Sequence, residues 1–255
     1  MVVAFVTRVA ESRGHEISFE DAGAGFPVAL INGYGGTAAE WREVGYVDQL
    51  AADQRRVLSI DCLGHGRSSA PHDWQQYTAP EVAQDLVRAM DAAQVERAAL
   101  WGYSRGAWLA ATVAAEYPER VAALVLGGCH SLFVAPDWSD EAWFQALLEG
   151  DWGVVEADFG MSEDDLRTFE SNDPRALGAA GIGRQRSDYV LDPSLITASI
   201  LVYCGGEDSP EVCEPVATAL GVDLHVVGSG GHAEAFHDAD KVLSLVLGHL
   251  EQTGI

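Results

Sequence analysis

Short apolar runs alternate with longer helical patterns from residue 27 to near the end of the chain, and this rhythm most constrains the fold. The runs are continuous, which is typical of strands buried on both faces of a sheet. They lie at residues 27–31, 56–60, 98–101, 121–128, 198–204 and 224–227. Helical patterns separate them at residues 38–52, 79–94, 104–117, 214–220 and 234–251. We expect an α/β fold, a mostly parallel sheet with helices on both faces.

Two local signals refine this expectation. Residues 1–26 contain two strand-like pieces around a turn at Glu11–Gly14, which predicts a hairpin. The sequence Thr78-Ala79-Pro80-Glu81 predicts a capping box with proline in the first turn of the second helix.

The rhythm breaks between about residues 131 and 197. We expect residues 1–130 and 196–255 to form the core, and residues 131–195 to form an inserted, mostly helical lid. The inserted segment is rich in aromatic residues, namely Trp138, Trp143, Phe144, Trp152, Phe159 and Phe169. Their ordinary role is the core of the lid, but together they also suggest a substrate with an apolar or aromatic portion.

Composition excludes several classes of partner. The formal net charge is −24, and such a surface repels nucleic acid and anionic membranes. No apolar stretch reaches the ~20 residues of a membrane span, and the first residues lack a basic leader. The four cysteines form no C-x-x-C pair, which favours reduced thiols in a cytoplasmic protein. The sequence shows no metal-binding cluster, so we expect no cofactor; it leaves the oligomeric state open.

The sequence Gly102-Tyr103-Ser104-Arg105-Gly106 lies between an apolar run and an Ala-rich helical pattern. Such a pattern also arises where an ordinary serine caps a helix. A nucleophilic serine needs an imidazole to take its proton, a carboxylate to orient that imidazole, and two N–H donors for the oxyanion. On an open α/β sheet these groups gather at the carboxyl ends of the strands. Each should therefore follow a strand.

The carboxylate and the base follow the last two predicted strands. Asp208 comes after the run at 198–204 and a Gly-Gly pair, with Glu207 as the reserve candidate. His232 comes after the run at 224–227 and a glycine-rich loop. The other histidines fit the role less well by position, although His130 is a candidate to line the site: His15, His65, His72, His130, His225, His237 and His249.

The oxyanion donors are backbone groups. One should be the N–H of Arg105, directly after the nucleophile. The other should be the N–H of Tyr34, in the loop Asn32-Gly33-Tyr34-Gly35-Gly36 that follows the first parallel strand.

These motifs together resemble the α/β-hydrolase superfamily with a serine nucleophile and a small lid. The order Ser104, Asp208, His232 matches, as do the loop at 31–36, the segment 61–69 and Gly231-His232. The resemblance implies a hydrolase that cleaves a carboxylic ester, lactone or related acyl bond of a small molecule through an acyl-enzyme. Because the nucleophile position holds serine, the chain differs from the dehalogenase and epoxide hydrolase relatives, which use aspartate there.

Two positions depart from the family pattern. Asn32 stands where the oxyanion loop usually begins with histidine, so the hydrogen bonding around that loop should differ. Arg105 stands where the residue is often uncharged. Its side chain either forms a salt bridge near the turn or anchors an anionic group of the substrate.

Other functions stay open at this point. The same triad serves C–C bond hydrolases, non-hydrolytic lyases and hormone binders without turnover. A remote alternative is a dinucleotide-dependent oxidoreductase, because residues 33–38 fit G-x-G-x-x-A and Asp61 ends the next strand.

Overall fold

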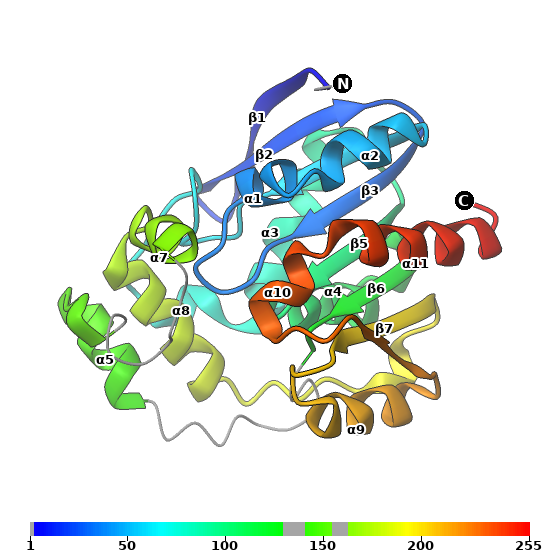
Figure 1. Cartoon of the computed structure of the whole chain (residues 1–255). Coiled ribbons are helices and arrows are strands. Elements are labelled where there is room, and N and C mark those ends of the chain that lie inside the picture. Colours follow the sequence, from blue (N-terminus) through cyan, green and yellow to red (C-terminus); the bar gives the residue numbers. More distant parts are fainter. Residues whose placement is uncertain (1–2, 130–140, 155–162) are drawn as a thin grey trace.

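The computed structural model describes residues 3–129, 141–154 and 163–255. In these residues the sheet has the strand order β1-β2-β4-β3-β5-β6-β7-β8 (Figure 1). From β4 through β8 every neighbouring pair is parallel, whereas β1–β2 and β2–β4 are antiparallel. The strands are Phe5–Ser12, His15–Gly23, Phe26–Ile31, Arg55–Ile60, Ala98–Tyr103, Val121–Gly127, Ser199–Gly205 and Leu224–Val227. The predicted α/β architecture is confirmed.

The predicted hairpin is also confirmed. Strands β1 and β2 pair in register from Phe5–Ala22 to Ser12–His15. The two residues between them, Arg13 and Gly14, both have positive φ angles, 49° and 80°, which suit a tight two-residue connection.

The helices follow the predicted rhythm with corrected boundaries. They are α1 Ala38–Glu43, α2 Tyr46–Ala52, α3 Ala79–Ala92, α4 Arg105–Glu116, α9 Pro210–Leu220, α10 His232–His237 and α11 Ala239–Gln252. The single helix expected at 38–52 breaks at Gly45, whose φ is 97°. The one expected at 234–251 is two helices that meet at Asp238. Short 3₁₀ turns occupy Trp74–Tyr77, Pro118–Arg120 and Pro193–Leu195.

The predicted capping box at Thr78 is wrong. The Thr78 side chain makes no capping hydrogen bond, although Pro80 does lie in the first turn of α3. A capping box instead begins α1, where the Thr37 N–H donates to Glu40 Oε2 at 2.7 Å.

The core has two layers, one on each face of the sheet. Helices α3, α4 and α9 pack on one face, and α1, α2, α10 and α11 pack on the other (Figure 1). Strand β5 is buried along its whole length, and it leads directly into α4. The residues that end β5 therefore lie in the middle of a packed frame.

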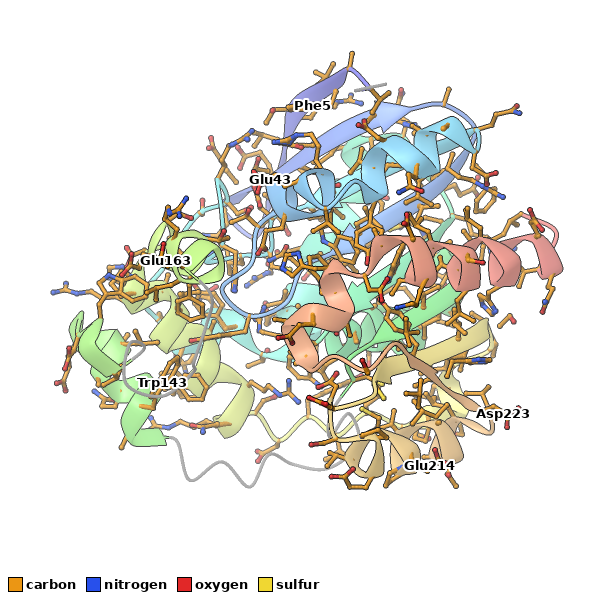
Figure 2. All side chains as sticks on the ribbon, in the orientation of Figure 1. Phe5, Glu43, Trp143, Glu163, Glu214 and Asp223 are labelled. Atoms are coloured by element: carbon orange, nitrogen blue, oxygen red, sulfur yellow. The ribbon has the colours of Figure 1, made fainter. Side chains whose placement is uncertain are left out.

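The segment between β6 and β7 forms a third apolar cluster of its own. Its described helices are α5 Glu141–Glu149, α7 Glu163–Glu170 and α8 Pro174–Arg186. Trp143, Phe144 and Phe169 are buried together there, and Trp152 packs against the Phe169 ring at 5.8 Å. Figure 2 shows Trp143 within this segment, to one side of the sheet. Trp138, Phe159 and His130 lie outside the described residues.

Hydrogen bonds join this segment to the loops that follow β3 and β4. The buried Asn172 amide donates to Gly35 O at 2.7 Å, and its oxygen accepts from the Gly66 N–H at 2.8 Å. The Tyr34 hydroxyl donates to Leu177 O at 2.6 Å. Searched over the described residues, the chain has no helix with the length and apolar character that a membrane crossing requires.

Candidate active site

Ser104 stands alone between β5 and α4, on a strained turn. Its φ of 55° and ψ of −121° lie outside the regions that an L-residue prefers. The Ser104 N–H donates to Gly127 O at 2.8 Å, which holds the turn against β6. Strain at a non-glycine residue persists only where the surroundings enforce it, and it clusters at functional sites.

Small neighbours make this turn possible. A Cβ atom on Gly102 would lie 2.1 Å from Gly106 O. A Cβ atom on Gly106 would lie 2.1 Å from Ile31 O, at the end of β3. Strand, helix and oxyanion loop therefore approach one another at distances that exclude any larger side chain.

Asp208 and His232 form a hydrogen-bonded pair. His232 Nδ1 lies 2.8 Å from Asp208 Oδ1, and the Asp208 side chain is 2% exposed against 38% for His232. A carboxylate only accepts, so Nδ1 carries the proton and Nε2 keeps its lone pair. The reserve candidate, Glu207, is exposed, and its N–H donates to Gly230 O at 3.0 Å. The geometry therefore favours Asp208 over Glu207 as the carboxylate that orients His232.

His232 and Ser104 are neighbours through shared contacts. The Tyr103 hydroxyl, one residue before Ser104, donates to His232 O at 2.7 Å, and the two rings lie 5.1 Å apart. Gly127 accepts the Ser104 N–H, and a Cβ atom on the next residue, Gly128, would lie 2.7 Å from His232 Cε1. The carboxyl ends of β5 and β6 thus bring the serine and the imidazole to the same edge of the sheet.

Two tyrosines that the sequence reading missed position this imidazole. Tyr103 holds the first residue of α10, and the Tyr46 hydroxyl donates to Phe236 O on the same helix at 2.5 Å. Burial raises the pKa of Tyr103 above its ordinary range, so its hydroxyl remains a donor. Only the position of Tyr103 beside the serine hinted at this role; nothing in the sequence marked Tyr46.

The two proposed oxyanion donors flank Ser104. A Cβ atom on Gly33, next to Tyr34, would lie 3.4 Å from Ser104 Cβ. Within the described ranges the N–H groups of Tyr34 and Arg105 donate to no protein acceptor. The Asn32 amide, in the position where histidine is usual, donates to Gly36 O at 2.5 Å and closes the loop from within.

The inserted segment packs directly on this loop. The Tyr34 ring contacts the rings of Trp143, Phe144 and Phe169, with centroids 5.6 to 6.2 Å apart. These rings are therefore used in packing the inserted segment against the core. The sequence linked the many aromatic residues of this segment to an aromatic substrate, but their role in packing weakens that argument.

The other described histidines are placed away from the carboxylate of Asp208. His65 is buried, with Nδ1 3.0 Å from Leu63 O, and His72 pairs with Asp173 at 2.9 Å. His15 contacts Gln76, and His225 and His237 are exposed on β8 and α10. His249 lies near the end of α11, and burial lowers its pKa.

Asp61, the acidic residue of the dinucleotide alternative, is already engaged. Its two carboxylate oxygens accept from the N–H groups of Ala38 and Arg67 at 2.7 and 3.1 Å. The glycine loop is engaged too, because Ser104 lies against Gly33, and a Cβ atom on Gly35 would lie 2.0 Å from the Phe169 ring. The engagement of Asp61 and of the glycine loop argues against that alternative. Among the residues described, no three His, Cys, Asp or Glu side chains gather as metal ligands would.

The Arg105 side chain does not form the salt bridge considered for it. The residue is 4% exposed, its guanidinium nitrogens are buried, and in the part of the chain that the structure describes no carboxylate pairs with it and no group of normal geometry accepts its hydrogen bonds. The backbone of Arg105 thus belongs to the turn at Ser104, while its side chain extends into the interior.

Comparison with known proteins agrees with this geometry. A model of the family described as alpha/beta hydrolase fold matches residues 27–160. The chain belongs to the alpha/beta hydrolase family. It is 36% identical to the 2-hydroxymuconate semialdehyde hydrolase of Pseudomonas sp. (strain CF600), over 91% of this chain and 89% of that one. The family and its hydrolase-named members identify the chain as an enzyme of this class.

Solved structures share the whole fold of this hydrolase. The enol-lactonase from Burkholderia xenovorans LB400 matches with a TM-score of 0.77 at 21% identity, and the match covers 96% of this chain and 100% of the lactonase chain. The bottromycin epimerase BotH has a TM-score of 0.81 at 23% identity, covering 95% and 98%. At these identities the likeness concerns the fold alone. A third relative is a 2-succinyl-6-hydroxy-2,4-cyclohexadiene-1-carboxylate synthase-like protein of Bacillus subtilis (strain 168). The sequence match with it covers 46% of this chain and only 42% of the relative's length, at 34% identity.

Proposed function

We propose that this chain is a serine hydrolase that cleaves a carboxylic ester, lactone or related acyl bond of a small molecule through an acyl-enzyme. The hydrogen bond between Asp208 and His232, beside the strained Ser104, carries this proposal. The pair fixes the imidazole tautomer whose Nε2 can accept a proton, and the strained turn at Ser104 places the serine hydroxyl at the same edge of the sheet.

In the first half of the reaction, Ser104 Oγ attacks the carbonyl carbon while its proton passes to His232 Nε2. Asp208 stabilises the imidazolium, and the N–H groups of Arg105 and Tyr34 stabilise the oxyanion. The tetrahedral intermediate then expels the alcohol oxygen, which takes the proton from the imidazolium. An acyl ester on Ser104 remains.

In the second half, His232 removes a proton from water as the water attacks the acyl-enzyme. The oxyanion forms again at the same two N–H groups. Collapse of this intermediate returns the proton to Ser104 and releases the carboxylic acid. We expect activity to fall in acid, because a protonated imidazole cannot act as the base.

A C–C bond hydrolase on the same residues is the second candidate. It is favoured by the extended identity with the 2-hydroxymuconate semialdehyde hydrolase, which covers both the core and the inserted segment. The core domains at 1–130 and 196–255 would supply the triad, and the lid at 131–195 would select the substrate. We further propose that the protein works in the cytoplasm, since its four cysteines, all within the described residues, are buried and form no disulfide.

Labelling with a fluorophosphonate tests the nucleophile. The wild-type protein should be labelled on Ser104, and Ser104→Ala should not be. A panel of esters, lactones and vinylogous diketones then separates the two candidate reactions. Equal labelling of both proteins would overturn the assignment of Ser104, and turnover of the diketones alone would favour the C–C hydrolase.

A further inference from the structure

We propose that the Arg105 guanidinium is a binding site for a carboxylate group of the substrate, so that the enzyme acts on monoesters or lactones of dicarboxylic acids. This inference rests on the proposed acyl-bond hydrolysis and adds the substrate class. It concerns the side chain of Arg105, whereas the oxyanion assignment concerns its backbone N–H.

The first observation is a buried cation whose hydrogen bonds are unfilled. Arg105 is 4% exposed, and Nε, Nη1 and Nη2 are each buried without a hydrogen bond of normal geometry among the described residues, the Cys62 thiol being the side chain beside them. Burying a charge without a partner is costly, and natural proteins pair such groups. A guanidinium offers a planar fork of donors that matches a carboxylate.

The second observation is that its surroundings are neutral. Burial raises the pKa of the Cys62 thiol to about 12, and a thiol sulfur is only a weak acceptor. Burial and the charge of Arg105 lower the pKa of His65 to about 3, so this imidazole is neutral at physiological pH. Burial also raises the pKa of Tyr34, whose hydroxyl is already bound to Leu177 O. None of these side chains can balance the positive charge.

Two carboxylates that lie within electrostatic reach of Cys62, as Arg105 does, have other partners. Both oxygens of Asp61 accept from backbone N–H groups. Asp85 accepts from Ser12 at 2.6 Å and pairs with Arg13 at 2.6 Å. Neither of these two carboxylates pairs with Arg105.

The third observation is a second arginine on the same side. Arg184, on α8 of the inserted segment, has its guanidinium 4.4 Å from the centre of the Trp108 ring. Burial and the positive charge of Arg105 lower the pKa of Arg184 to about 10. The positive charges of Arg105 and Arg184 therefore lie within electrostatic reach of each other.

The position of the site also fits a substrate. Arg105 follows Ser104 directly, and its side chain lies among residues of the loops after β3 and β4. His232 approaches Ser104 from the other side, next to β6 and β7. A substrate with its scissile carbonyl at Ser104 would place a terminal carboxylate at Arg105 and leave the imidazole unobstructed.

Paired substrates test the proposal by turnover. We would compare the p-nitrophenyl monoester of succinic acid with p-nitrophenyl butyrate, at about 150 mM salt to reduce the repulsion from the net charge of −24. The ratio of kcat/KM for the anionic ester to that for the neutral ester should fall at least tenfold in Arg105→Gln and less in Arg105→Lys. Arg88→Gln, which removes an exposed arginine paired with Asp91, is the charge control and should leave the ratio unchanged.

Calorimetric binding separates this proposal from the proposed function. Titration of Ser104→Ala with the anionic ester needs no turnover, and its dissociation constant should rise at least tenfold in Ser104→Ala/Arg105→Gln. An unchanged ratio and unchanged affinity would overturn the carboxylate site, as would chloride or phosphate binding where the carboxylate does not. If Arg105→Gln fails to fold, a wild-type preference for the neutral ester of more than tenfold refutes the proposal by itself. Loss of fluorophosphonate labelling would instead refute the hydrolase.

Discussion

Substituting Asp208 by asparagine tests the central pair of the site. The change keeps the size of the side chain but removes the negative charge that lies 2.8 Å from His232 Nδ1. It also offers an NH₂ group where only an acceptor stood, which favours the tautomer with the proton on Nε2. Both effects oppose proton transfer from Ser104, so kcat should fall.

The size of the fall follows from the geometry. Two unit charges about 4 Å apart interact with about 4 kcal/mol at an effective dielectric of about 20, the value suited to pairs near a surface. The imidazole is 38% exposed, so solvent screening reduces this to about 3 kcal/mol. Because about 1.36 kcal/mol corresponds to a factor of ten, we expect kcat to fall on the order of 10²–10³-fold.

The assay is steady-state hydrolysis of a p-nitrophenyl ester, together with the rate of fluorophosphonate labelling. Glu207→Gln is the matched control, because it removes the exposed carboxylate next door and should change kcat less than twofold. Thermal unfolding of both variants checks that each is folded. Equal losses in the two variants, or a loss below tenfold in Asp208→Asn, would refute the assignment.

Three further outcomes are expected. Gly106→Ala should lower the free energy of unfolding by about 2–3 kcal/mol, because its Cβ would lie 2.1 Å from a backbone oxygen. Gly248→Ala, which has open space around it in α11, should raise the free energy of unfolding by about 1 kcal/mol. Urea denaturation measures both values, and equal values would contradict the close packing around Ser104. His65 keeps a folded pKa of about 3, so only the unfolded state binds its proton between about pH 6.5 and 3, and stability falls as the pH falls. From pH 6.5 to 4.5 the wild type should lose about 2 kcal/mol more than His65→Gln in the same assay, and parallel losses would refute burial of a neutral imidazole. Asn172→Leu, which removes the bonds to Gly35 O and Gly66 N–H, should speed proteolysis within the inserted segment; unchanged cleavage would show that these bonds do not hold it.

The sheet and the order of the site residues could be read from the sequence, because continuous apolar runs define buried strands and the carboxyl ends of parallel strands meet at one edge. Ser104, Asp208 and His232 each follow such a run, so their approach needed only the topology. Local chemistry was less decisive. Thr78 has the residues of a capping box, yet the box forms at Thr37, and Gly45 interrupts a helical pattern whose apolar spacing continues past it.

Contacts between distant segments could not be read in this way. Tyr46 binds a carbonyl 190 positions away, and Asn172 binds one 137 positions away. The partner of each depends on how helices and loops pack, which leaves no periodic signal in the chain. The sequence named Arg105 as unusual, but only its burial without a partner separates an internal salt bridge from a site for an external anion.

Tyr34 belongs at once to the catalytic loop and to the inserted segment. Its hydroxyl is bound to Leu177 O, its ring is packed among the aromatic residues of that segment, and its N–H is assigned to the oxyanion. On the proposed mechanism, a movement of the inserted segment away from the core would break that bond and free the loop that carries the Tyr34 N–H. The packing of the inserted segment and the position of a proposed oxyanion donor therefore depend on the same side chain.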